Sequence, residues 1–160
     1  MQLLSFVLVL LLQHHTMPGG VSHQEHHAQM QKEADLKRHG AMAMGFDQDK
    51  TAHKFSSTAT GGSIEVTVKD PADEASRTAI RAHLKHIAEA FAKGDFEKPF
   101  QTHGEIPPGV PEMQRLKAAI TYKYEELSQG GAVRIVTADP EALRAVHEFL
   151  AYQGREHHPK

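Results

Sequence analysis

The sequence has 160 residues, 39% of them hydrophobic, which suits one domain with a modest core and leaves no room for two catalytic lobes. Its 20 acidic and 18 basic residues nearly cancel, so the charge provides no sequence-independent grip on nucleic acid or anionic lipid. The lack of cysteine excludes disulfides, thiolate zinc sites, cysteine nucleophiles and a lipoprotein-type lipid anchor. The 13 histidines are the unusual feature, because protonating all of them would add 13 charges to the formal −2.

Residues 3–12, LLSFVLVLLL, form an apolar run that is too short to span a bilayer and has the length of a signal-peptide h-region. The small residues Gly20 and Ser22 fit cleavage before Val21 or before His23. We therefore predict that residues 1–22 are a signal peptide and that the protein is periplasmic or secreted, with no membrane contact after cleavage. The alternative is a misassigned start codon ahead of a cytosolic domain.

Residues 23–45 are polar and rich in histidine and methionine, and they lack a clear apolar stripe. They predict a flexible or weakly helical arm that ends at Gly45. Imidazole and thioether groups suit copper, so the arm is a weaker candidate metal site. Its candidate ligands are His23, His26, His27, His39, Met42 and Met44. The alternative is a solvated linker that binds no metal.

An internal repeat follows the arm. Residues 53–71, HKFSSTATGGSIEVTVKDP, align without a gap on residues 122–140, YKYEELSQGGAVRIVTADP. Each copy predicts a strand, a Gly-Gly turn, a second strand, and a helix opened by Asp-Pro. The glycines would supply positive φ for a tight hairpin, the aspartate would cap the helix, and the proline would occupy its first position.

The predicted helices carry one apolar stripe each. The first, within residues 73–93, places Ile80, Leu84, Ile87 and Phe91 on one side, and the second, from Pro140, does the same with Leu143, Val146 and Leu150. We therefore predict a single α+β domain over residues 46–158, with repeats at 53–93 and 122–154. Its duplicated β-β-α units would form a four-stranded antiparallel sheet with the two main helices on one face.

Four histidines form a candidate metal cluster for copper or zinc. His83 and His86 are three residues apart on the first helix, His53 has the inward parity of its strand, and His147 lies on the buried side of the second helix. Glu89 could act as a carboxylate partner. His103 lies in the proline-rich loop predicted for residues 95–111 and is a weaker candidate. The alternative for all of these histidines is ordinary packing and hydrogen bonding.

The sequence contains no G-x-S-x-G elbow, P-loop, G-x-G-x-x-G or H-E-x-x-H motif. Our leading hypothesis is an exported, non-enzymatic binding module that holds a transition metal ion through histidines. The alternative is a protein-interaction or scaffold domain without metal, and the third possibility is a small enzyme that uses histidine with glutamate as acid and base. Glu65, Thr67, Lys69 and Arg134 predict a polar outer sheet face, which favours the ligand over a docked protein partner.

Five stretches taken together resemble a family of small exported bacterial proteins: AMGFDQDKTAHKF, GGSIEVTV, IRAHLKHIAEAFAKGDF, PPGVP and EALRAVHEFLAYQ. The resemblance covers residues 41–158 and implies export but no particular reaction. Some members carry the label aspartate carbamoyltransferase. That enzyme binds carbamoyl phosphate through a Ser-Thr-Arg-Thr-Arg run, and the nearest run here, residues 74–78, lacks the second arginine. Its regulatory chain needs a four-cysteine zinc site, which this sequence cannot form, so we do not expect transferase activity.

Overall fold

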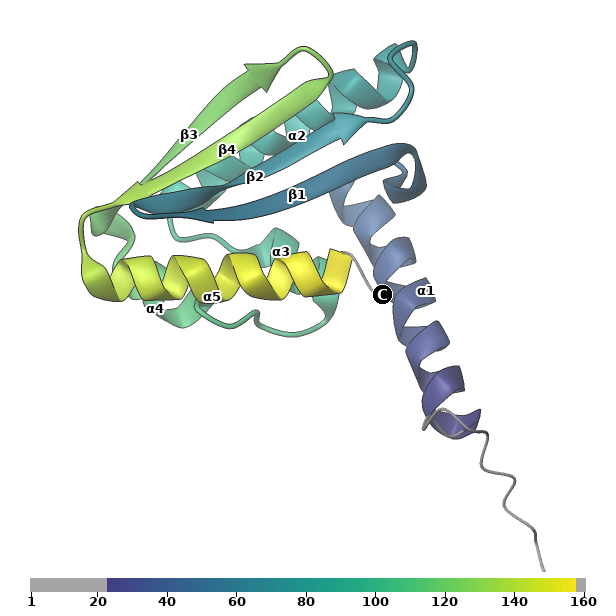
Figure 1. Ribbon diagram of the computed structural model, residues 1–160, viewed down its shortest axis with the longest axis horizontal. Coiled ribbons are helices and arrows are strands. Elements are labelled where there is room, and N and C mark those ends of the chain that lie inside the picture. Colours follow the sequence, from purple (N-terminus) through teal and green to yellow (C-terminus); the bar gives the residue numbers. More distant parts are fainter. Residues whose placement is uncertain (1–22, 158–160) are drawn as a thin grey trace, which may run out of the picture. The chain divides into compact units, whose positions relative to one another are not determined.

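A computed structural model of the chain describes residues 23–157 (Figure 1). The chain divides into two compact units, one up to Ala34 and one from Asp35 onward. In the first unit the described residues belong to a single helix, and the second unit holds the sheet and the other helices. The elements are α1 (His23–Met44), η1 (Gln48–Lys50), β1 (Thr51–Thr58), β2 (Gly61–Val68), α2 (Glu74–Ala92), α3 (Glu97–His103), α4 (Val110–Arg115), η2 (Lys117–Ala119), β3 (Ile120–Leu127), β4 (Gly130–Thr137) and α5 (Pro140–His157).

The duplicated β-β-α architecture is confirmed. The four strands form one antiparallel sheet in the order β1-β2-β4-β3, and β1 and β2 match β3 and β4 at an offset of 69 residues at both ends. Leu150 of α5 lies against Gly62, and Leu84 of α2 lies against Gly131. These two glycines occupy equivalent positions in the repeats, so both helices cover the same face of the sheet.

Each main helix covers the hairpin of the other repeat. The first-repeat helix α2 packs mainly on β3 and β4, and the second-repeat helix α5 packs mainly on β1 and β2. Arg81 of α2 donates to the carbonyl oxygens of Leu127 (2.9 Å) and Gly130 (3.2 Å). This contact attaches α2 to the second hairpin.

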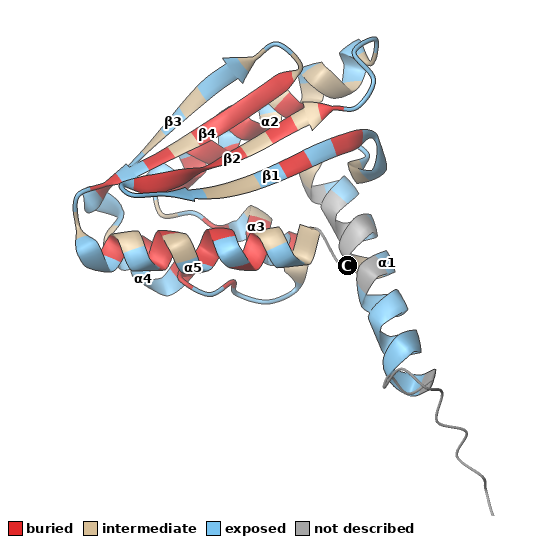
Figure 2. Cartoon of the chain, viewed as in Figure 1, coloured by how far each residue is buried: buried red, intermediate tan, exposed pale blue. Residues whose placement is uncertain are grey.

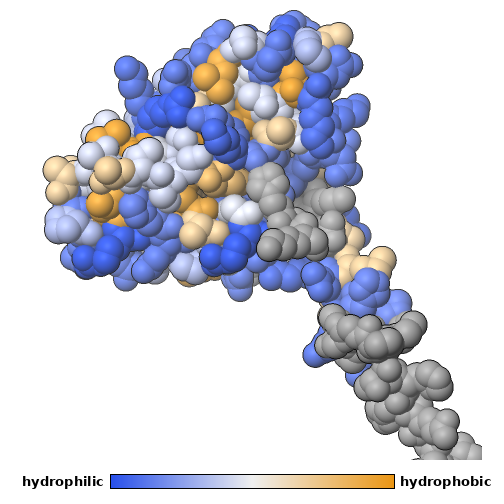
Figure 3. Space-filling model, in the orientation of Figure 1, coloured by the Kyte–Doolittle hydropathy of each residue, from blue (hydrophilic) through white to orange (hydrophobic). Residues whose placement is uncertain are grey.

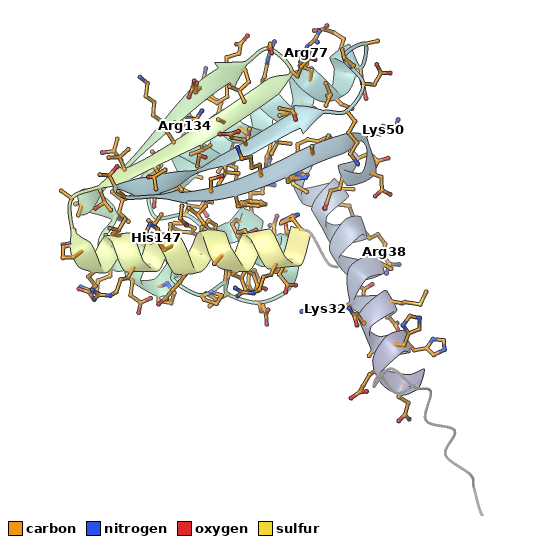
Figure 4. All side chains as sticks on the ribbon, viewed as in Figure 1. Lys32, Arg38, Lys50, Arg77, Arg134 and His147 are labelled. Atoms are coloured by element: carbon orange, nitrogen blue, oxygen red, sulfur yellow. The ribbon has the colours of Figure 1, made fainter. Side chains whose placement is uncertain are left out.

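A matching contact attaches α5 to the first hairpin. Nε2 of His147 on α5 donates to the carbonyl oxygens of Thr58 (2.9 Å) and Gly61 (3.1 Å) at the turn of the first hairpin (Figure 4). Thr58 and Gly61 precede Leu127 and Gly130 by the same 69 residues that relate the strands. We call these two contacts the hairpin clasps.

The Gly-Gly pairs have a different role from the one predicted. The turns are formed by residues 59–60 and 128–129, and the glycines are the first residues of β2 and β4. Of the four, only Gly61 has a positive φ, 149°. A Cβ atom at Gly61 would lie 1.9 Å from the Ile135 carbonyl oxygen, and one at Gly130 would lie 2.0 Å from that of Val66. Glycine is therefore required by the close approach of the two central strands.

The Asp-Pro prediction is confirmed for α5 and wrong for α2. Asp139 accepts hydrogen bonds from the backbone N–H groups of Glu141 (2.8 Å) and Ala142 (2.9 Å), as an N-cap does. Asp70 instead accepts from Ala72 (2.9 Å) within a turn, and α2 begins later. There Asp73 is the N-cap and accepts from Ser76 (3.0 Å). The hydrogen bonds between Ser76 and the Asp73 carboxylate lower the pKa of Asp73.

Residues 23–44 form one continuous helix, α1, which ends where Gly45 adopts a φ of 79° and donates to the Ala41 carbonyl oxygen. Met44 packs against the core, Phe46 is buried, and the second compact unit starts at Asp35. The predicted signal peptide, residues 1–22, lies outside the described residues. In the described part of the chain, no helix is long and apolar enough to cross a membrane.

Buried positions concentrate on the central strands β2 and β4, whereas the edge strands β1 and β3 alternate with exposed residues (Figure 2). The sheet face opposite the helices is polar, as predicted. Arg134 pairs there with Glu65 (2.7 Å) and with Glu125 (2.6 Å). In the view of Figure 3, hydrophilic residues cover most of the described surface and hydrophobic residues form separate small patches.

Candidate ligand site: a pocket lined by four histidines

A pocket opens between the helix-covered face of β1 and β2 and the helices α2, α3 and α5. It encloses about 60 Å³, which is room for about four to six water molecules. Its walls are largely apolar, and they include Phe55, Ile64, Val66, Leu84, Phe91 and Phe149. Four histidines, from β1, α2, α3 and α5, supply most of its polar lining: His53, His83, His103 and His157.

His53 and His83 are the two members of the predicted cluster that the structure brings to one place. His53 is 8% exposed, which confirms the inward parity predicted for its strand position. Both rings contact Phe46, with ring centroids 6.2 Å away for His53 and 5.7 Å away for His83. Burial lowers the pKa of His83 to about 4, and the nearby charges of Lys98, His86 and His53 act in the same direction. His83 is therefore a neutral imidazole at pH 7.

His103 and His157 complete the set. The ring of His157 lies 5.2 Å from that of His53 and 5.4 Å from that of His103, centroid to centroid. The sequence predicts a loop at His103, where the structure has a helix, and His157 is not part of the predicted cluster. A signal for His157 was present, because Phe149, Gln153 and His157 follow one another at spacings of four and continue the buried stripe of α5. His103 depends on α3, a seven-residue helix that contains a proline and was not predicted.

Two further polar groups face this pocket with unused hydrogen-bonding capacity. Gln153 is 5% exposed; its Oε1 lies 2.9 Å from Nε2 of His103, and its Nε2 has no hydrogen-bond partner among residues 23–157. Leaving a buried amide donor unsatisfied costs about 1–3 kcal/mol. Lys98, at the edge of the pocket, forms no ion pair with any described residue. A ligand that accepts hydrogen bonds would satisfy both groups.

No aspartate or glutamate belongs to the described lining of the pocket. The ring of Tyr152 contacts His103 edge-on (5.1 Å), and its hydroxyl donates to Oε1 of Glu105 (2.6 Å). Burial, reinforced by this hydrogen bond, raises the pKa of Tyr152. The Glu105 carboxylate is thus engaged by Tyr152, and the pocket combines neutral and cationic polar groups with apolar walls.

The other predicted cluster members lie elsewhere. His86 is exposed on α2, so it is not a pocket residue, and Glu89 is exposed as well. His147 belongs to a hairpin clasp, where its Nε2 is occupied by two carbonyl oxygens. In residues 23–157, no three His, Asp or Glu side chains are placed where they could hold one metal ion. The rings of His53 and His157 are stacked at 24°, so their nitrogen lone pairs lie in two nearly parallel planes and do not converge on one point.

The candidate ligands on the arm all belong to α1. His26 and His27 are exposed, and Met42 is 72% exposed. Met44 is half-buried and lines the four-histidine pocket, so its thioether packs with the core of the second unit. The side chains of His23 and His39 lie outside the described part of the chain.

Comparisons of this chain with protein-family models, with curated proteins and with solved structures find no match.

Proposed function

We propose that this chain is a small exported module that binds a small ligand, without catalysing a reaction, in the four-histidine pocket. The observation that carries the proposal is the pocket itself: an apolar cavity in which a buried amide donor, Nε2 of Gln153, has no partner among the described residues. Sites for small molecules are typically apolar concavities with a few well-placed polar groups. The apolar run at residues 3–12 and the resemblance to small exported bacterial proteins support a periplasmic or secreted location.

The size of the cavity limits the ligand. A free volume of about 60 Å³ holds a group of about four to six non-hydrogen atoms, if each is given the space of a water molecule. A nucleotide or a coenzyme could enter only with one end. We therefore expect the natural ligand to be a small molecule or the tip of a larger one.

A copper or zinc ion is the second candidate, because three imidazoles, those of His53, His103 and His157, lie in successive ring contact. Coordination at about 2.0–2.1 Å would require these side chains to rotate toward a common point. Acid would release the metal by protonating the imidazoles. A scaffold role for the polar sheet face has less support, since Arg134 is already paired there with Glu65 and Glu125.

The test is two-dimensional NMR of the protein produced without a polyhistidine tag. The probes are three five-carbon compounds with one tail and different head groups, namely valerate, pentanamide and pentylamine, followed by Cu(II) and Zn(II) salts. Binding of at least one probe should shift the amide signals around Phe55, Leu84 and Phe149 and leave the outer face of β3 unchanged. If no probe moves the pocket signals, the proposed function is wrong. If only a metal moves them, the second candidate takes its place.

A further inference from the structure

The polar groups of the four-histidine pocket indicate which kind of ligand it accepts, provided that the proposed function holds. The lining contains one full positive charge, on Lys98, and the buried amide donor of Gln153, and it contains no described carboxylate. An anion is the complement of this set, because an ammonium ion and an N–H group both donate to carboxylate oxygens. A cationic head group would find no opposite charge here.

The walls define the rest of the ligand. Phe55, Leu84 and Phe149 are contributed by β1, α2 and α5, and together they form an apolar lining around the cavity. Such walls favour an aliphatic tail, since each methylene group removed from water contributes about 0.8 kcal/mol. The volume of about 60 Å³ holds about four to six non-hydrogen atoms, so a four-carbon tail fills most of it and the carboxylate lies beside Lys98.

The location of the charge agrees with this assignment. Lys98 lies in the first turn of α3 and is half-buried at the pocket, close enough to His83 for its charge to be felt there. Gln153 is buried on α5, where its Oε1 faces His103, and the residue belongs to the lining of the cavity. One carboxylate could accept a hydrogen bond from each, with one oxygen directed to the ammonium group and the other to the amide.

We infer that the pocket binds a short-chain aliphatic monocarboxylate, whose carboxylate is held by Lys98 and Gln153 and whose tail lies among Phe55, Leu84 and Phe149. The same head group also occurs at the C-terminus of a peptide. The small cavity favours the free acid, because a peptide C-terminus brings a side chain and a further peptide bond to the same place.

The experiment compares the affinities of valerate, pentanamide and pentylamine by NMR titration at pH 7, with N-acetyl-leucine as a model of a peptide C-terminus. Valerate should bind at least about tenfold more tightly than the other two five-carbon probes, a difference of about 1.4 kcal/mol. Lys98→Met should weaken valerate binding by about five- to tenfold, and Gln153→Leu should weaken it as well. Lys123→Met is the matched control, because Lys123 is exposed on the edge strand β3 outside the pocket lining, and it should leave the affinity unchanged.

Each other outcome overturns the inference in a recognisable way. Equal or tighter binding of pentanamide or pentylamine would refute the carboxylate and leave the binding pocket intact. Tighter binding of N-acetyl-leucine would assign the head group to a peptide end. Unchanged affinity in a folded Lys98→Met variant would remove the proposed anchor. If none of the organic probes binds, the proposed small-molecule function fails, and the inference fails with it.

Discussion

His83 shows how a single side chain couples this fold to pH. It is held inside the sheet-helix interface, where burial disfavours the charged imidazolium form. The groups that face it are the Lys98 ammonium from α3, His86 from its own helix and His53 from β1, and all three lower its pKa further. None of the three is an acid that could favour protonation.

The first prediction concerns acid stability. The folded pKa of His83, about 4, is below its ordinary value of 6.5, so the unfolded chain binds the proton more readily. Stability from this residue is complete above about pH 6.5 and is lost as the pH falls toward 4. Between these pH values, the unfolding free energy of His83→Leu should fall by about 2 kcal/mol less than that of the parent protein. Urea unfolding at pH 7, 5.5 and 4.5 measures this difference.

The control for that prediction is His26→Leu, an exposed histidine of α1 that is not among the groups acting on the pKa of His83. This substitution also removes an imidazole, but one that is exposed to solvent rather than buried. We expect this variant to retain the pH dependence of the parent protein. A parent-like pH dependence in His83→Leu would show that other groups cause the acid sensitivity.

The prediction of site residues from the sequence succeeded where strand parity sufficed. His53 was expected to point inward because it shares the parity of Phe55, and it does. His147 was correctly placed on the inner side of its helix, but parity cannot show how far along the sheet a residue lies. His147 contacts the hairpin turn at residues 58–61, whereas the pocket is lined by His53 farther along β1. His103 was a weaker candidate, but its place at the pocket could not be predicted, since α3 is short and its position depends on tertiary packing.

At the level of elements, the strands were predictable because the repeat supplies two independent readings of the same pattern. The alternation of Ile64, Val66 and Val68 is matched by Val133 and Ile135, and all five are buried. The pairing of β2 with β4 is a contact between sequence-distant strands, so the reason for the Gly-Gly pairs was not visible from local sequence. Hairpin chemistry was the natural interpretation, and the close central pairing is the actual cause.

The second prediction tests that cause. Gly130→Ala places a methyl group 2.0 Å from the Val66 carbonyl oxygen, so β2 and β4 must move apart. We expect a loss of about 3 kcal/mol or more in unfolding free energy, measured by urea denaturation. Gly154→Ala is the control: it lies in α5, its new Cβ would meet only the Phe55 Cβ at 3.9 Å, and alanine is the better helix former. A small effect of Gly130→Ala would mean that the strands are less closely paired than described.

For the whole molecule, the crossed arrangement of helices and hairpins makes the repeats depend on each other. Each hairpin is covered mainly by the helix of the other repeat, because α2 packs mostly on β3 and β4 and α5 packs mostly on β1 and β2. Opening one repeat therefore uncovers the other. Such a domain should unfold in one cooperative step, as small single domains usually do.

The third prediction follows from this dependence. Arg81→Ala removes the donor of one hairpin clasp and should lower the unfolding free energy by about 1–3 kcal/mol. Although these hydrogen bonds of Arg81 reach the second hairpin, slow amide exchange should accelerate equally in β2 and in β4, as hydrogen-exchange NMR would show. Arg144→Ala, an exposed arginine on α5, is the control and should change neither value. Faster exchange confined to β3 and β4 would contradict the single cooperative unit.

The hairpin clasps and the crossed packing of the helices also bear on whether one repeat could fold without the other. A peptide with one hairpin and its following helix would lose the helix that covers most of its sheet face, and its own helix would lose most of the surface on which it packs. Two such peptides could complete each other about a twofold axis, each donating its helix to the partner, in the self-complementary manner of a symmetric dimer. The segment between α2 and β3 is then a linker that joins the two halves of such a dimer covalently. In that sense the protein is an intramolecular dimer, and its repeat is a unit of assembly rather than a unit of folding.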